Sequence, residues 1–181
     1  MDRFIDALKI SIPGCPSVLL KNETLRAAIR FCEETWIWQS GEDVSVGIGE
    51  TNISPSIPSN SRLIGAKVLR DTVNVYRYSR SADVLTLDDS PSQETTFSVT
   101  AYLAPTRTAT SLPNFLYLDW FEAIEAGAQV GVLMIPGKPW SNPSTAAVKR
   151  VTYLHHMGEA KIKSKKKNDQ TELVVTRRPF V

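Results

Sequence analysis

The sequence contains few of the residues from which most catalytic and metal sites are built. It has two cysteines and two histidines among 181 residues. Cys15 lies in an expected turn and Cys32 on the apolar stripe of an expected helix, so we interpret both as reduced thiols. His155 and His156 are adjacent, whereas paired metal ligands on a helix need i, i+4 spacing. We therefore expect no metal and no cofactor.

Long apolar runs are also absent. No stretch of about 18 apolar residues occurs, which excludes a membrane-spanning helix. Residues 1–6 lack the basic segment and the apolar stretch of a secretory signal, so the sequence predicts none. A 42% share of hydrophobic residues still suffices for a core. The length fits one domain, or one domain with an elaborated insertion.

Carboxylates are present, but their spacing does not favour catalysis. Glu33 and Glu34 are neighbours on an expected helix and point about 100° apart, so they cannot share a proton. The segment 47–49 (Gly-Ile-Gly) is too short for a dinucleotide loop. The remaining carboxylates that we considered lie in turns or on solvated faces: Asp88, Asp89, Asp119 and Glu122. The sequence therefore predicts a protein that is not an enzyme.

Charge is distributed unevenly along the chain. The net charge is +2, but residues 149–181 carry nine basic and three acidic side chains, hence +6, which leaves −4 for residues 1–148. Such asymmetry indicates a polyanion, an acidic partner surface, or self-association through opposite poles. Five lysines make up the densest part of the basic end: Lys161, Lys163, Lys165, Lys166 and Lys167.

Helical periodicity marks both ends of the sequence. We expect a short helix or strand over residues 4–10, and a helix capped by Asn22 that ends near Trp36 or Trp38. Further helices are expected over residues 114–133 and 143–163. The former contains a patch of small residues that permits close helix packing, within the protomer or against a neighbour. The expected core comprises Leu25, Ile29, Cys32, Trp36, Phe115, Phe121, Ile124, Leu133, Val148 and Val151.

The middle of the chain has the alternating pattern of β-strands. Strands are expected around residues 44–48, 62–69, 72–78, 84–87 and 95–103, with a loop over residues 51–61. The predicted fold is α+β, a helical bundle with an inserted antiparallel β-rich element and an extended C-terminal arm. Its segments are a helical part (1–42), the β insertion (43–104), further helices (105–167) and the arm (168–181).

A proline-rich corner separates the last two expected helices. Three prolines and a glycine within eight residues cannot continue a helix, because each proline fixes φ and removes a backbone donor. Asn142 can cap the following helix, and Pro143 suits its first position. The corner residues are Pro136, Gly137, Pro139, Trp140, Asn142 and Pro143. We expect Trp140 to hold the corner, with Trp140→Ala costing about 3–5 kcal/mol if the ring is buried.

The end of the chain is extended by composition, because it combines β-branched residues with a proline. Such a segment is either a frayed tail or an arm that docks on another chain by adding a strand or filling a pocket. The residues of this arm are Leu173, Val174, Val175, Arg177, Arg178, Pro179, Phe180 and Val181.

Three parts of the sequence are similar to one known family. Residues 12–16 (Ile-Pro-Gly-Cys-Pro) with the helix over 25–36, the helix over 112–131 with the corner 136–143, and the ending 177–181 (Arg-Arg-Pro-Phe-Val) resemble the head-to-tail adaptor proteins of tailed bacteriophages. The resemblance covers about half of the chain, at both ends. The β insertion, the histidine pair and the lysine cluster are not part of it.

This resemblance implies a structural role in the virion neck. It implies a ring of about twelve copies that joins the capsid portal to the next tail component and lines the DNA exit channel. Residues 173–181 would be the portal-docking arm, and loops 51–61 and 88–95 would be candidates for contact with the tail. Genomic DNA would touch the channel only transiently, without sequence preference.

A second hypothesis is a sequence-tolerant nucleic-acid-binding protein. The lysine cluster with Arg177 and Arg178 would contact phosphates and give a steep salt dependence. The lysines lack interleaved aromatic residues for base stacking, which weighs against this hypothesis. A solvated helix end explains the same lysines without any ligand.

Overall fold

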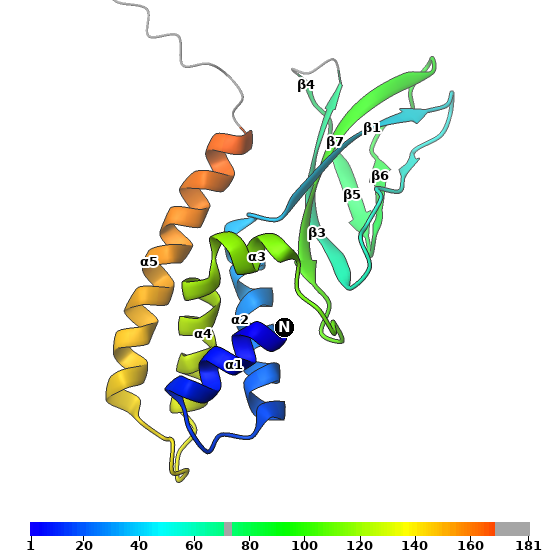
Figure 1. Ribbon diagram of the computed structural model, residues 1–181. Coiled ribbons are helices and arrows are strands. Elements are labelled where there is room, and N and C mark those ends of the chain that lie inside the picture. Colours follow the sequence, from blue (N-terminus) through cyan, green and yellow to red (C-terminus); the bar gives the residue numbers. More distant parts are fainter. Residues whose placement is uncertain (71–73, 169–181) are drawn as a thin grey trace, which may run out of the picture.

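The computed structural model describes residues 1–70 and 74–168 (Figure 1). It has the predicted α+β fold, in which a β-rich block is inserted between helices. Asn168 ends the last helix, and the rest of the predicted arm lies outside the described residues. The elements in chain order are α1 (Asp2–Ser11), α2 (Ser17–Thr35), β1 (Gln39–Val46), β2 (Asn52–Ile53), β3 (Ser61–Arg70), β4 (Asn74–Val75), β5 (Tyr78–Ser81), β6 (Val84–Leu87), β7 (Thr95–Pro105), α3 (Asn114–Asp119), α4 (Phe121–Leu133) and α5 (Pro143–Asn168).

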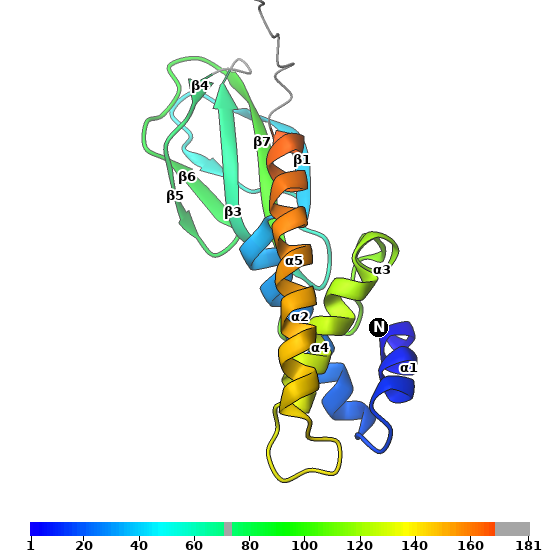
Figure 2. The same cartoon turned by 90° about the vertical axis from the view of Figure 1, so that its left-hand side faces the viewer.

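The helices form a bundle with α4 between α2 and α5. Helix α1 packs on α2 and α4, on the side of the bundle away from α5 (Figure 2). The last turns of α5 rise beyond α4 to the level of the sheets (Figure 1). Large apolar side chains that are fully buried fill the interior of the bundle, among them Leu8, Leu20, Phe31, Leu116 and Ile124.

The β block consists of two antiparallel sheets. One has the strand order β1-β7-β3-β4 and the other β2-β6-β5. Alternation along β7 buries Phe97, Val99, Ala101 and Leu103, as the sequence predicts for one face of a strand. These side chains form a second core with residues from the other strands, including Ile53, Val68, Leu85 and Leu87. The block therefore has a core of its own beside that of the bundle.

Several predicted strand bounds need correction. The first strand begins at Gln39 and not near residue 44, because β1 pairs with β7 over its whole length, up to Gln39 opposite Tyr102. The predicted loop 51–61 contains the short strand β2, which pairs with β6. Of the predicted strand 72–78, residues 72 and 73 lie outside the described part, residues 74 and 75 form β4, residues 76 and 77 are in no strand, and residue 78 begins β5. The strand predicted at 84–87 is confirmed.

Helix α2 starts earlier than its predicted cap. Pro16 has an extended backbone, and its carbonyl accepts hydrogen bonds from the amides of Leu19 and Leu20, so the helix begins at Ser17. Asn22 lies within the helix and caps nothing. At the other end Trp36 occupies the left-handed region, with φ 53° and ψ 31°. This conformation costs a bulky residue about 1–3 kcal/mol, and glycine is usual there.

The helix predicted over residues 114–133 is two helices. Trp120 has φ −132° and ψ 24°, which breaks the helical ladder between α3 and α4. Its ring is buried, with its centroid 5.3 Å from that of Phe31 on α2. The carbonyl of Trp120 then accepts the amide of Ile124, which opens α4. Helical periodicity continues across such a break, so the sequence pattern did not reveal it.

The proline-rich corner folds as predicted. Asn142 caps α5, because its Oδ1 accepts the amide of Thr145 at 3.0 Å, and Pro143 is the first helical residue. The amide of Asn142 returns to the carbonyl of Leu133 at 3.0 Å, which ties α4 to α5. Trp140 is half-buried against the bundle core, so we expect Trp140→Ala to cost less than a fully buried tryptophan would, about 1–3 kcal/mol.

The predicted core is correct on α2 and α4 but wrong at the outer face of α5. Leu25, Cys32, Ile124 and Leu133 are buried, while Ile29, Phe115 and Phe121 are half-buried. Three predicted core residues are exposed: Trp36 (49%), Val148 (65%) and Val151 (69%). Helix α5 instead buries Ala146, Tyr153, Met157 and Ala160, which lie on the opposite side. Trp36 leaves the apolar stripe of α2 because the helix ends before it.

Candidate functional site

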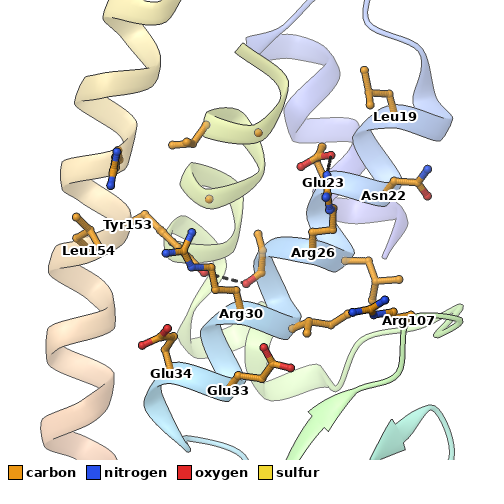
Figure 3. Close-up of a pocket in the computed structure, with 17 residues that line it drawn as sticks. Leu19, Asn22, Glu23, Arg26, Arg30, Glu33, Glu34, Arg107, Tyr153 and Leu154 are labelled. Carbon is orange, nitrogen blue, oxygen red and sulfur yellow. Dashed lines mark hydrogen bonds and ion pairs between the residues drawn. The ribbon is translucent and has the colours of Figure 1, made fainter. Parts of the chain in front are cut away.

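A groove of about 1070 Å³ lies between α2, α4 and α5. Figure 3 shows Arg26 and Arg30 projecting from α2, with Tyr153 and Leu154 on α5 across from them. Arg107, in the segment after β7, lies at one end. The groove therefore brings together residues from distant parts of the sequence.

The floor of the groove depends on two glycines of α4. A Cβ added to Gly127 would lie 2.8 Å from the ring of Tyr153 and 2.9 Å from the Cβ of Ala27. A Cβ on Gly131 would lie 2.2 Å from a carboxylate oxygen of Glu23. The predicted patch of small residues thus serves packing inside the protomer.

Tyr153 joins α5 to α2 at this point. Its hydroxyl donates a hydrogen bond of 2.9 Å to the carbonyl of Ala27. Burial raises the pKa of Tyr153 above its usual range, because the phenolate would lose its hydration. The hydroxyl is therefore a structural donor that keeps its proton, and it does not serve as a base.

The rim of the groove is basic. Arg26 pairs with Glu23 at 2.8 Å. Arg30, Arg107 and Arg150 have no ion pair with any carboxylate in the part of the chain that the structure describes. Guanidinium groups bind carboxylates and phosphates through paired N–H donors. The rim is thus suited to an anionic partner.

Two carboxylates of the rim already have cationic partners. Glu33 pairs with Arg62 of β3, and Glu34 pairs with Lys161 of α5 at 3.4 Å. They join the C-terminal end of α2 to a sheet and to the last helix. As adjacent helical residues they face different neighbours, in agreement with the sequence argument that they do not form a carboxylate dyad.

Both cysteines are free and buried. Burial, and to a lesser extent the charge of Glu33, raises the pKa of Cys32 to about 12. Burial also raises the pKa of Cys15. A nucleophilic cysteine needs a lowered pKa and access to solvent, so the environment of these thiols favours inert packing.

The predicted lysine cluster is spread around α5. Lys161 pairs with Glu34, and Lys163 pairs with Asp119 at 3.4 Å while lying over the ring of Trp120. Lys165 and Lys166 are exposed. The side chain of Lys167 is outside the described part. The cluster is therefore no single patch, because successive helical residues point in different directions.

The remaining residues considered from the sequence are those of the C-terminal arm and the two histidines. The arm (Leu173, Val174, Val175, Arg177, Arg178, Pro179, Phe180, Val181) lies outside the described residues. His156 contacts Glu159 at 2.9 Å and Glu122 at 3.7 Å, while His155 contacts Glu159 at 3.5 Å. No group of three such side chains in residues 1–70 and 74–168 has a geometry that would hold a metal ion.

Sequence reasoning missed the basic rim. Arg26 and Arg30 share the polar face of α2 at i, i+4 spacing, and this was a usable signal. Arg107 and Arg150 come from the segment after β7 and from α5, and no local pattern joins them to α2. Only the tertiary arrangement brings these arginines together.

No family model matches the chain, and no curated protein matches it. Within the described residues no helix is both long enough and apolar enough to cross a membrane.

Proposed function

We propose that this chain is a structural subunit of a head-to-tail adaptor, a homo-oligomeric ring in the neck of a tailed-bacteriophage virion. The ring would connect the capsid portal to the downstream tail component and surround the exit channel of the DNA. The family resemblance of the two ends of the sequence suggests this role, and the surfaces of the bundle support an assembly function.

The observation that carries the proposal is the exposed apolar face of α5. Val148 and Val151 lie one turn apart on the solvent side of this helix and are 65% and 69% exposed, with Ile162 (59%) about three turns further on and Leu154 (49%) where this face meets the groove. Exposed apolar side chains that gather on one face mark surfaces that are covered by another molecule. Because the opposite side of α5 already packs on the bundle, the outer face is left for a neighbouring subunit.

A ring also needs a second, different surface. In a closed ring each subunit presents one surface to the preceding copy and another to the following copy. The groove beside α5 offers such a surface: its lining includes the apolar side chains of Leu19, Ile29 and Val130, which an apolar helix face of the next subunit can contact, and Arg30, Arg107 and Arg150 on its rim can pair with carboxylates of that subunit.

Oligomeric state tests the proposal directly. Particle images of the chain mixed with portal rings should show a second ring seated on the portal. Val151→Asp should abolish ring formation, because a carboxylate would be buried without a partner in the interface. Ile10→Asp is the control, since Ile10 is 85% exposed on α1, on the side of the bundle away from α5 and outside the lining of the groove. A wild-type chain that stays monomeric with portals of every candidate phage would refute the ring.

The proposed arm has its own test. Deleting residues 176–181 should leave the thermal unfolding of the subunit unchanged and abolish its capture by portal rings. Capture by the portal at wild-type affinity would contradict the arm while leaving the ring interface untouched.

A further inference from the structure

The structure places an exposed aromatic ring among lysines at the junction of α2, β3 and α5. A pocket of about 440 Å³ there includes Trp36, Lys67, Lys161 and Lys165 in its lining. This volume lies in the range of about 300–1,000 Å³ that small-ligand sites occupy. We call these four residues, together with Glu34, the tryptophan notch. In the sequence, the lysines of α5 have no aromatic residues between them on which a base could stack. In the notch, Trp36 supplies an aromatic ring next to Lys161 and Lys165.

Trp36 has the properties of a stacking platform. Its indole ring lies on the buried ring of Tyr102, with centroids 4.9 Å apart and planes 19° from parallel. Trp36 nevertheless keeps 49% of its surface exposed. A planar ring that is supported from behind and open in front can stack on a nucleic-acid base of any kind.

The backbone of Trp36 is held in a strained conformation by surrounding groups. Its φ of 53° is in the left-handed region, which bulky residues rarely adopt. The carbonyl of Trp36 accepts hydrogen bonds from the hydroxyl of Ser164 at 2.9 Å and from the side-chain amide of Gln39 at 3.0 Å. A second bond of 2.9 Å joins Gln39 to the hydroxyl of Ser164. Such a conformation persists only where the surrounding structure holds it, so the position of the Trp36 ring is fixed.

The charges around the ring favour a polyanion. Lys67, Lys161 and Lys165 line the notch from a strand and a helix, against the single carboxylate of Glu34. Glu34 holds Lys161 at 3.4 Å. Three cations and one anion leave a net charge of +2 beside the ring, suited to the phosphates that flank a stacked base.

We propose that the tryptophan notch binds a single-stranded nucleic-acid segment. One base stacks on Trp36, and the neighbouring phosphates contact Lys67, Lys161 and Lys165. The recognition is independent of base sequence, because stacking and phosphate contacts do not read base edges. This inference does not depend on ring formation and is measured on the dilute full chain.

The test is a titration of a fluorescent oligothymidylate of about twelve nucleotides, followed by anisotropy over a series of salt concentrations. Contacts to about three phosphates should make the logarithm of affinity fall with the logarithm of salt at a slope near −2. Trp36→Gly should weaken binding about tenfold without changing this slope, since it removes stacking alone. Thermal unfolding should show that the variant stays folded.

Charge variants separate the notch from the rest of the basic end. Lys67→Gln with Lys165→Gln should reduce the slope to about −0.7, whereas Lys138→Gln, the control at the exposed corner, should leave it unchanged. Glu34→Gln should tighten binding, because it frees Lys161 from its ion pair. This expected gain cannot result from unfolding.

Four outcomes would overturn the inference. They are no binding at low salt, equal affinity of Trp36→Gly and wild type, complete loss of the salt dependence in Arg177→Gln with Arg178→Gln, and Trp36-independent binding of an oligoglutamate peptide with the same affinity. Duplex DNA of the same length should bind more weakly than the single strand, because its bases are already stacked. A duplex that loses as much affinity as the single strand on Trp36→Gly would also count against the notch, because paired bases cannot stack on the ring.

Discussion

The two sides of α5 are both apolar, yet only one of them is buried. The inner side packs Ala146, Tyr153 and Met157 into the bundle, while the outer side leaves Val148 and Val151 in solvent. The inner side can pack closely because Ala27 of α2 and Gly127 of α4 are small and leave room for the ring of Tyr153. The comparison teaches that complementary shape on the facing helix decides which apolar side is buried, and not the amount of apolar surface.

The largest expected effect concerns Phe31 of α2, a fully buried residue whose ring lies 6.2 Å from that of Tyr153 on the inner side of α5. Phe31→Ala should lower the free energy of unfolding by about 3–5 kcal/mol, because the ring is fully buried between Trp120 and Tyr153. Val151→Ala, on the outer side, should change it by less than about 0.5 kcal/mol. Denaturant unfolding under conditions that keep the chain monomeric measures both. Similar losses in the two variants would erase the difference between the sides.

A matched pair of glycines sharpens the same comparison. Gly127→Val should destabilise the protein by about 2–3 kcal/mol, because the new side chain collides with Tyr153 and Ala27. Gly158→Val should be neutral within about 0.5 kcal/mol, since nothing lies within 4 Å of its Cβ position. The test uses urea midpoints of both variants. A tolerated Gly127→Val would mean that the three helices can separate at little cost.

The dependence of the unfolding free energy on alkaline pH tests whether the thiol of Cys32 is shielded from water. The thiol has a pKa near 12 in the folded chain and about 8.5 in the unfolded chain, so the unfolded state loses its proton first. Stability is therefore fully present below about pH 8.5 and falls as pH rises towards 12, by about 2 kcal/mol between pH 8 and pH 10. Cys32→Ala should make this pH dependence of the unfolding free energy shallower. An unchanged slope would place Cys32 in contact with water.

The smallest expected effect tests the hydrogen bond that joins α5 to α2. Tyr153→Phe keeps the ring and removes the bond to the carbonyl of Ala27, so it should cost about 0.5–1.5 kcal/mol. Tyr117→Phe is the control, because Tyr117 is half-buried and its hydroxyl has no hydrogen bond among the described residues. Equal unfolding free energies for the two variants would assign the contact between α5 and α2 to packing alone.

Local chemistry made much of the fold predictable. Asn142 and Pro143 start a helix because one side chain caps it and the other has the required φ. Alternation made the buried face of β7 readable, from Phe97 to Leu103. The break at Trp120 was not predicted, because an apolar residue fits both a continuous helix and a helix end.

Only some residues of each candidate site were predicted from the sequence. The lysines of α5 and the polar face of α2 were visible in the sequence as charge patterns. Their neighbours were not, because Arg107 reaches the groove from the segment after β7 and Lys67 reaches the tryptophan notch from β3. Trp36 was predicted to be buried because its spacing continues the apolar stripe of α2. The helix ends at Thr35, so Trp36 does not lie on that stripe.

The sequence by itself determined the α+β class, the kind and order of most elements, the stiff corner and the basic end of the chain. These properties depend on dihedral preferences, side-chain alternation and charge, all of which act between near neighbours in the chain. Only the tertiary structure decided which side of α5 is buried and which cations lie beside Trp36. Both depend on the shapes of surfaces from distant segments, and no residue carries that information within its own stretch of sequence.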